Sequence, residues 1–419
     1  MRASSRRVAK PPSVASPNRA TSRVVSSKPK PNDKGCAESL EEQVLEEVVA
    51  ATYWFDPGKE GDPYTALIRF AGRRVGPTGK PQTKDRFDQV EVVKNVVPGT
   101  GPVSVTTRVS GINPGEWIVT AEPIVRQSQG RFVKTYAGPA QNGAGSLTKA
   151  PWSWRKPANP IGSPTALKTC PAPFAKRPGT WPGAWWGFVG PGVLLGLALQ
   201  SVLLSRANLD VRAALLVSVA ACMAGFVGAK VWFLALNRSF RGPFTEGLCI
   251  QGFVVGALVT AAIALPLARL PIGTFMDGTA PGLFFGMALG RPGCFFIGCC
   301  AGRPTTSRWG IWSSDRNVGA RRIPTQLLES LLCLAIGAGA LVLVLHPSTA
   351  MASGAVLVGA VAAYVLGRQF LLPFRAEPRK SSIGPRLSMS AAAVVLAAAV
   401  LVLAGACIPL GVHPILLLC

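Results

Sequence analysis

The feature that most constrains this chain is a series of apolar runs that begins near Trp185 and continues toward the C-terminal end. Each run is about 20 residues long, the length that a helix needs to cross a bilayer. A bilayer offers the backbone no hydrogen-bond partners, so these segments are expected as helices. Trp181, Trp185 and Trp186 fit an interfacial aromatic belt at the start of the first. We expect about seven crossings, at 185–204, 213–236, 247–268, 274–290, 326–346, 352–367 and 388–410.

The segment before these runs shows a different periodicity. Apolar residues alternate with polar ones over short stretches, which predicts strands. Pro- and Gly-containing turns separate the stretches, at a spacing typical of a small antiparallel sandwich of immunoglobulin or fibronectin type. The expected strands are 48–55, 64–70, 87–97, 103–109 and 117–121. The predicted fold class is therefore an all-α polytopic membrane protein preceded by a small all-β sandwich domain.

Composition divides the chain into four parts. We expect a disordered basic tail at 1–40, a β-sandwich-like soluble domain at 41–130, a Pro/Gly/Trp-rich linker at 131–182 and a membrane domain at 183–419. The tail lacks the apolar core of a cleavable signal peptide. Arginine-rich loops would ordinarily mark the cytoplasmic side, but arginines that bind substrate would obscure that rule, so the orientation stays open.

The net charge and the cysteine content limit which ligands and partners the chain is expected to bind. The net charge is +24, yet the basic residues lie in the tail, the soluble segment and loops, which favours membrane-surface and phosphate-headgroup contact over nucleic acid. The two histidines, His346 and His413, have no metal-ligand spacing to the ten cysteines, so we expect no metal. Cys36 and Cys170 flank the soluble segment and would pair only outside the cell, which the sequence leaves open.

The unusual chemistry is concentrated at residues 290–305, which read Gly-Arg-Pro-Gly-Cys-Phe-Phe-Ile-Gly-Cys-Cys-Ala-Gly-Arg-Pro-Thr. Arg291 closes a membrane-length apolar run, and such a charge costs several kcal/mol unless an anionic or aqueous group receives it. The glycines allow a backbone or a lipid headgroup to approach closely. We interpret this stretch as a polar loop that forms the floor of a lipid-handling site.

Other polar residues lie close to the predicted spans. Asp277 is a helix-capping carboxylate, a polar partner of Arg291, or a catalytic acid or base. Gln251 is expected a few residues inside the bilayer, where an amide needs partners. Arg368 lies directly beside an apolar run, whereas Arg375 either extends to the interface or contacts phosphate.

These motifs resemble those of the prolipoprotein diacylglyceryl transferase family. The stretch at 290–305 resembles the family signature, and residues 322–329 are similar to its Arg-His-Pro-x-Gln-Leu-Tyr-Glu element. Residues 246–252 fall where the family has a glycine-rich segment, and residues 277–281 resemble its Asp-x-x-Ala-Pro. The arginines at 368 and 375 match the spacing of two family arginines. The resemblance covers about residues 183–410.

The resemblance implies a multi-pass enzyme of the bacterial plasma (inner) membrane that needs no cofactor. Its partners would be phosphatidylglycerol, prolipoprotein signal peptides and the bilayer. It would move a diacylglyceryl group from phosphatidylglycerol to the lipobox cysteine thiol and release glycerol phosphate. Arg291 and Arg368 would hold the phosphate, while Gly302 and Arg303 would shape the loop. The catalytic candidates are Arg291, Arg368, Asp277 and Gln251, and the substrate-binding candidates are Arg303, Gly302, Gly293, Cys294, Cys299, Arg322, Gln326 and Glu329.

The chain also departs from the family pattern. The family's asparagine and glutamate fall on Cys294 and Cys299, its histidines on Gln251 and Ile323, and its tyrosine on Leu328. A histidine base is therefore missing. The alternative function is an inactive relative that binds anionic phospholipid or lipoprotein precursors and presents its β domain to a partner. A covalent mechanism through Cys299 or Cys300 is a further hypothesis, and the lack of paired repeats disfavours a transporter.

Overall fold

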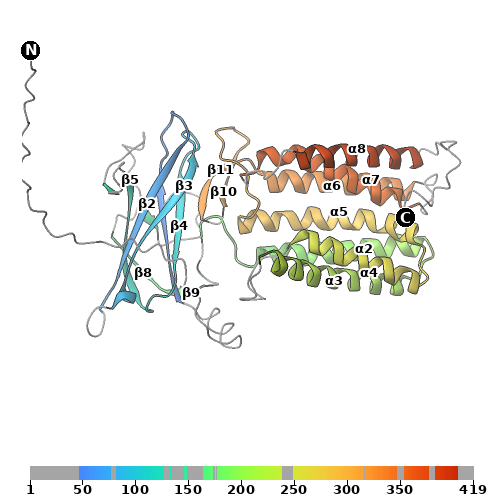
Figure 1. Ribbon diagram of the computed structural model, residues 1–419, viewed down its shortest axis with the longest axis horizontal. Coiled ribbons are helices and arrows are strands. Elements are labelled where there is room, and N and C mark those ends of the chain that lie inside the picture. The colour runs from blue at the N-terminus through green and yellow to red at the C-terminus, as the bar shows by residue number, and fades with distance from the viewer. Residues whose placement is uncertain are drawn as a thin grey trace, which may run out of the picture.

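A computed structural model places a β-sheet domain at one end of a bundle of long helices (Figure 1). The described residues are 47–76, 82–126, 132–133, 146–148, 164–172, 175, 177–237, 249–315, 317–346, 353–376 and 383–403. The expected basic tail lies outside them, as does Cys36, so the pairing of Cys36 with Cys170 stays a prediction.

The five strands expected from alternation are present. They are β1 (Glu47–Phe55), β2 (Tyr64–Arg74), β3 (Arg86–Val96), β4 (Val103–Val109) and β5 (Glu116–Arg126). Within 131–182, where we expected a linker, lie β6 (Phe132–Val133), β7 (Ser146–Thr148), β8 (Thr165–Lys168) and β9 (Cys170–Pro171). These strands have four residues or fewer, which is too short to show an alternating pattern.

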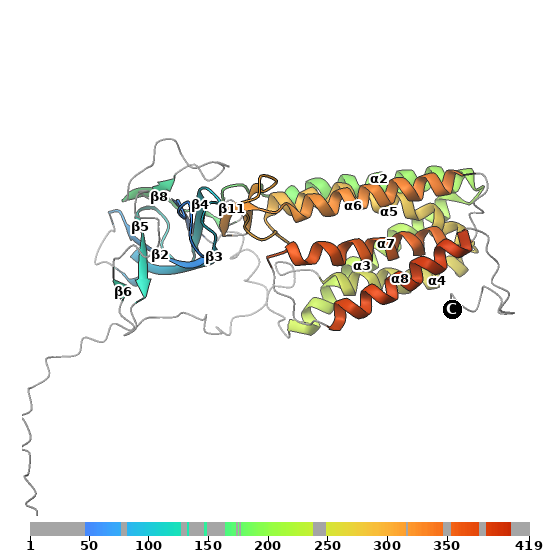
Figure 2. The same ribbon diagram turned by 90° about the horizontal axis from the view of Figure 1, so that it is seen from above.

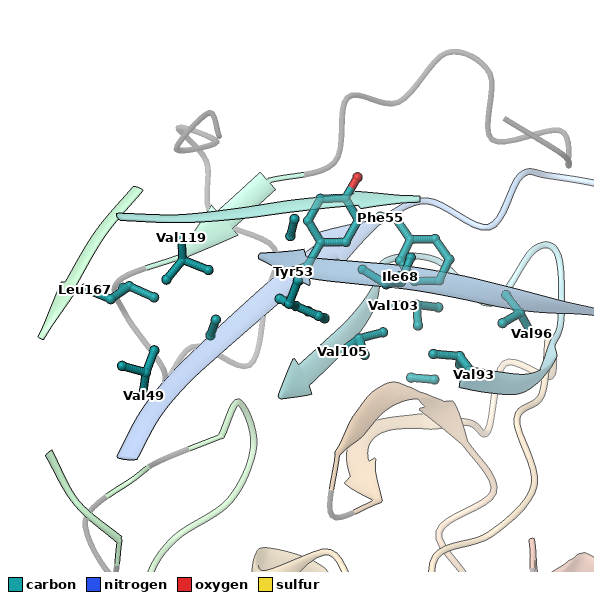
Figure 3. Close-up of a cluster of buried hydrophobic side chains, with 14 of the residues drawn as sticks. Val49, Tyr53, Phe55, Ile68, Val93, Val96, Val103, Val105, Val119 and Leu167 are labelled. Carbon is teal, nitrogen blue, oxygen red and sulfur yellow. The ribbon is translucent and has the colours of Figure 1, made fainter. Parts of the chain in front are cut away.

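The strands form two antiparallel sheets with the core between them. One sheet has the order β10-β11-β4-β1-β7, in which β10 is Ile311–Asp315 and β11 is Val318–Arg322, and the other has the order β3-β2-β5-β6. Figure 3 shows Val49, Tyr53 and Val105 of the first sheet meeting Ile68 and Val119 of the second. Each such buried side chain contributes roughly 1.5–3 kcal/mol. The sheet-rich domain is thus as expected at the level of two packed sheets.

Two further strands come from a distant part of the sequence. β10 (Ile311–Asp315) and β11 (Val318–Arg322) form a hairpin that follows the signature stretch, and β11 pairs with β4. Figure 1 shows this hairpin between the β domain and the helices. This hairpin from the helical region therefore completes a sheet of the N-terminal domain, and the division of the chain at residue 182 stays a prediction. Its five-residue strands and distant partner gave no local signal.

A tryptophan stack reinforces this junction. The rings of Trp54 and Trp312 lie 5.3 Å apart at 21°. Trp312 also donates its indole N–H to the carbonyl oxygen of Pro102 at 3.0 Å. The β domain is consequently joined to the hairpin by aromatic contact as well as by the β4–β11 backbone pairing.

Each expected apolar segment corresponds to a helix. The helices are α2 (Ala184–Arg206), α3 (Val211–Asn237), α4 (Ile250–Leu267), α5 (Ile272–Ile297), α6 (Thr325–Leu345), α7 (Ala355–Leu371) and α8 (Ile383–Leu403). Among the described residues, six helices are long and apolar enough to cross a membrane, whereas α8 offers the shorter apolar segment Leu387–Leu403. Figure 2 shows the helices lying lengthwise beside one another.

The predicted end of the fourth apolar segment at residue 290 is wrong. Helix α5 continues through Arg291 and Pro292 and ends at Ile297, where Gly298 takes the left-handed conformation with φ 78°. A window of apolar residues stops at the first arginine. The helix does not stop there, because a neighbouring helix neutralises that charge.

Glycines bring α2 and α5 into close contact. A Cβ added to Gly282 would lie 2.4 Å from the carbonyl oxygen of Gly196, and one on Gly286 would lie 2.7 Å from that of Gly192. Neither distance is tolerated, so both positions need glycine. The close backbone approach fixes α5, which carries the signature arginine, against α2.

Acidic pH is expected to lower the stability of the β domain, because it protonates the buried carboxylate of Asp85. Hydrogen bonds from Asn113 and the backbone of Gln82, together with Arg74, favour its charged form and hold the pKa of Asp85 below its ordinary value. Because the pKa of Asp85 is lower in the folded than in the unfolded protein, its charged form stabilises the fold. This stabilisation is fully present above the pKa of the unfolded state and is lost as the pH falls through the pKa of the folded state. Unfolding followed by tryptophan fluorescence between neutral pH and strong acid should show this loss. Asp85→Asn should flatten the pH dependence, and an unchanged profile would contradict the assignment.

Candidate active site

The polar site lies where three helix ends meet beside the β domain. α5 ends there, α6 begins there and α7 ends there, because these helices run in alternating directions. Their polar residues therefore come to one level: Arg291 near the end of α5, Glu329 in the first turns of α6, and Tyr364 with Arg368 toward the end of α7.

Glu329 is the centre of this group. Its side chain is 4% exposed, and its Oε1 lies 2.8 Å from Nη2 of Arg291 and 2.8 Å from Nη1 of Arg368. Its Oε2 lies 3.6 Å from Nη2 of Arg375. The residues at 291, 329, 368 and 375, with Tyr364, form what we call the arginine cluster. The resemblance suggested several of these residues but not the central place of Glu329.

Tyr364 is the residue that sequence reasoning missed. Its hydroxyl donates to Glu329 Oε1 at 2.8 Å and accepts from Arg291 at 2.6 Å and from Arg368 at 2.9 Å. A signal was available, because residues four apart on a helix share a face. Tyr364 therefore precedes Arg368 by one turn and joins the arginines of two helices.

The charges of the cluster do not balance. Three guanidiniums face one carboxylate, which leaves two positive charges unmatched by any other acid that the described residues bring into contact. The side chains of Arg291 and Arg375 are only 17% and 11% exposed. Partly buried like charges are costly unless an anion compensates them. The cluster is thus suited to receive an anionic group with bidentate hydrogen bonds.

The loop after α5 holds Arg375 in place. Gly302 pairs with Arg375 in an isolated β-bridge, and Arg303 donates from its Nε to the carbonyl oxygen of Arg375 at 3.1 Å. A Cβ on Gly302 would lie 2.0 Å from the carbonyl oxygen of Ile323, so this position requires glycine. Arg375 therefore does not extend to the interface, one of the two roles considered for it. The shaping role expected of Gly302 and Arg303 stays a prediction.

Arg322 contacts the protein rather than the cluster. It is 4% exposed, donates from Nη1 to the carbonyl oxygen of Gly302 at 3.0 Å, and lies 3.6 Å from Asp315. Burial lowers the pKa of Arg322, and Asp315 opposes that shift. This side chain therefore connects β11 to the loop that holds Arg375.

Gln326 and the cysteines close the turn after α5. Gln326 donates to the carbonyl oxygen of Cys299 at 2.9 Å, and the Cys299 thiol lies 3.7 Å from the carbonyl oxygen of Cys294. Hydrogen bonding with Cys294 and then Cys300, together with burial, raises the pKa of the Cys299 thiol. A thiol that stays protonated is a poor nucleophile, which argues against Cys299 as the covalent nucleophile.

Three predicted catalytic or binding residues lie apart from the arginine cluster: Gly293, Asp277 and Gln251. Gly293 faces the start of α2, where an added Cβ would lie 3.1 Å from the Cα of Trp185. Asp277 lies 14 residues before Arg291 on one helix, about 21 Å away. Its two oxygens accept backbone N–H groups of Gly354 and Val356 at 3.0 and 2.9 Å, so it caps the start of α7 and is not the partner of Arg291.

Gln251 differs from the expectation of a buried amide. It is exposed in the first turn of α4, and its amide oxygen accepts from the Cys249 thiol at 2.7 Å. The helix begins at Ile250, so this side chain lies at the end of the span and not inside it.

The fold and the arginine cluster define a multi-pass membrane protein with an arginine-rich polar site at the helix ends beside its β domain. The chain belongs to the prolipoprotein diacylglyceryl transferase family, whose model matches residues 178–408. Similar proteins include the phosphatidylglycerol–prolipoprotein diacylglyceryl transferase of Trichormus variabilis, 27% identical over 155 residues, 35% of this chain and 55% of that protein.

Two further relatives come from Paenarthrobacter aurescens and Streptomyces coelicolor. The enzyme of Paenarthrobacter aurescens is 28% identical over 197 residues, 41% of this chain and 61% of that protein. Phosphatidylglycerol–prolipoprotein diacylglyceryl transferase 2 of Streptomyces coelicolor is 34% identical over 155 residues, 36% of this chain and 48% of that protein. The chain spans about half the length of the curated relatives it matches.

Proposed function

We propose that this protein transfers a diacylglyceryl group from phosphatidylglycerol to the lipobox cysteine thiol of prolipoproteins in the bacterial inner membrane. The observation that carries the proposal is the arginine cluster, in which Glu329 neutralises only one of three guanidiniums. A phosphodiester headgroup supplies one of the two missing negative charges, and the phosphate monoester that leaves supplies the second. The names of the relatives and the family membership support this substrate class.

The reaction requires one bond to form and one to break. The thiol sulfur attacks the glyceryl carbon beside the phosphate, the C–O bond breaks, and its electron pair moves to the phosphate oxygen. The leaving group is a phosphate monoester that gains negative charge, which Arg291 and Arg368 stabilise. Its second pKa is about 6, so it is also an acceptor for the thiol proton. This route removes the need for a histidine base.

The same proposal includes the arrangement in the membrane. We take α8 as a seventh crossing, the two packed sheets as an immunoglobulin-type domain, and residues 183–419 without the hairpin as the membrane domain. The β domain would then stand on the face where the arginine cluster opens. An acceptor peptide would reach the cluster from the same face.

An inactive lipid-binding relative is the second candidate function. The observation in its favour is the absence of histidine from the arginine cluster: among the described residues, the one histidine, His346, follows the opposite end of α6. His413 lies outside the described residues. Such a protein would retain anionic lipid and present its β domain to a partner.

Complementation separates the two candidates. Cells depleted of their own transferase would express the chain, and the mass of a reporter lipoprotein would be measured. We expect a gain of one diacylglyceryl group, its loss in Arg291→Ala, and its retention in Arg206→Ala, an exposed arginine at the opposite end of α2. A lipid-binding relative would give no gain, and Arg291→Ala would then only weaken retention of phosphatidylglycerol. No gain with normal membrane insertion would contradict the enzyme.

A further inference from the structure

A second basic site lies in the β domain, remote from the arginine cluster. A pocket of about 210 Å³ opens where β2 ends and β3 begins. Its charged lining consists of Arg73, Arg74, Arg86 and Asp85, and its apolar lining includes Val75 and Ile118. Three guanidiniums and one carboxylate leave two positive charges in excess.

The register of the sheet places two of these arginines opposite each other. Arg73 of β2 faces Arg86 of β3 across the ladder, and it faces Ile118 of β5 on its other side. Opposite residues in an antiparallel pair have Cβ atoms about 4.5–5.5 Å apart, and like charges there destabilise the sheet. Both side chains are exposed, so solvent screens much of this repulsion, and an anion held between them would relieve the remainder.

The protein does not supply that anion from the part of the chain the structure describes. Asp85 accepts from Asn113 at 2.9 Å and from the backbone of Gln82 at 2.9 Å, and it already pairs with Arg74 at 3.3 Å. In the same described residues, neither Arg73 nor Arg86 has an ion pair. The Nε atom of Arg74 is buried there without a hydrogen-bond partner.

Glu116, which accepts from the backbone N–H of Val75, forms no ion pair among the described residues, and two other carboxylates of β3 and β5 are occupied elsewhere. Asp88 and Glu122 both pair with Arg69, four residues before Arg73 on the same strand. Arg69 is therefore a neutralised arginine of the same sheet, whereas Arg73 and Arg86 are not. The contrast makes Arg69 a matched control.

We propose that this pocket binds a small phosphate-bearing anion, either inorganic phosphate or the phosphate of a short phosphomonoester. The guanidiniums of Arg73 and Arg86 are placed to hold the phosphate oxygens from both strands. Val75 and Ile118 are 44% and 37% exposed and form an apolar wall for the carbon atoms of a monoester.

The pocket faces the aqueous compartment. The opposite end of β2, at Tyr64, pairs with Val96 beside the turn at Gly99, where an added Cβ would lie 3.2 Å from Thr306 of the helical part. Arg74 is ten residues further along the strand, about 33 Å away. The ligand therefore arrives from solution, and the proposal does not depend on the transferase function.

Titration of the whole protein in detergent, with Arg291→Ala in every variant to suppress phosphate binding at the arginine cluster, tests this inference. Inorganic phosphate and glycerol 1-phosphate would be added at constant ionic strength, with sodium chloride as the reference. We expect both probes to bind and to raise the unfolding temperature. Arg73→Gln combined with Arg86→Gln should weaken binding at least tenfold, while Arg69→Gln should leave it unchanged. Tighter binding of glycerol 1-phosphate would assign the site to monoesters, and equal binding would assign it to phosphate.

A second measurement, the unfolding temperature without ligand, tests the proposal even if the double variant does not fold. Arg86→Gln alone removes the cross-strand repulsion, so its ligand-free unfolding temperature should rise above that of the wild type. Equal stabilisation by chloride, or equal binding to the wild type and the double variant, would overturn the proposal.

Discussion

Glu329→Ala is expected to abolish diacylglyceryl transfer and to lower the stability of the helix bundle by about 3–5 kcal/mol, the cost of removing one partner from a buried ion pair. The carboxylate contacts Arg291, Arg368 and Tyr364, and it faces Arg375 at 3.6 Å. Without it, the three guanidiniums repel one another and lose their common orientation. Transfer to a reporter lipoprotein and thermal unfolding in detergent measure the two effects.

Two variants sharpen this test. Glu329→Gln keeps the shape and one acceptor oxygen but removes the charge, so it should retain more of the fold than Glu329→Ala while transfer stays strongly reduced. Ser330→Ala is the matched control, because the next residue on α6 donates to the carbonyl oxygen of Ala288 instead. Full activity of Glu329→Gln would show that the charge of this residue is not needed.

Trp312→Ala is expected to detach the β domain from the hairpin and to lower transfer about tenfold or more. The change removes the 5.3 Å stack on Trp54 and the hydrogen bond to Pro102, at a cost on the order of 2–3 kcal/mol for a half-buried tryptophan. The effect reaches the site because Arg322 of β11 binds Gly302, which pairs with Arg375. A tenfold rate loss corresponds to about 1.4 kcal/mol.

Limited proteolysis and turnover should change together in this variant. Trp312→Phe keeps an aromatic ring for the stack and should restore most of the activity. Trp309→Ala, which alters a 74% exposed tryptophan in the same loop, should have little effect. Normal transfer by a protein whose β domain is readily cleaved away would contradict the coupling between the hairpin and the cluster.

Local patterns in the sequence predicted much of the secondary structure. Alternation predicted strands β1 to β5, because each is long enough for the period of two to be visible. Apolar length predicted every helix of the bundle, because the bilayer imposes it. Alternation did not predict β8, because a strand of four residues is too short to show the period. Apolar length did not predict the end of α5, because this helix continues past the arginine that ended the apolar run.

The chemistry of the candidate site was only partly visible. Arg291 and Arg368 were predictable because a charge beside an apolar run demands a partner. That the partner is Glu329 and not Asp277 was not predictable, since both carboxylates occur near arginine-bearing segments in the sequence. Tyr364 lay within reach of the argument, because it stands one turn from Arg368.

The sequence by itself determined that this protein is a helical membrane protein with a β domain and an arginine-containing signature. These properties depend on composition and on residues close together in the chain. Tertiary structure alone decided that Glu329 joins three arginines from different segments, that Asp277 caps α7, and that the hairpin at 311–322 completes a sheet begun at residue 47. The reason is physical: ion pairs and strand pairing act between groups adjacent in space, and no local pattern records which distant segments will meet.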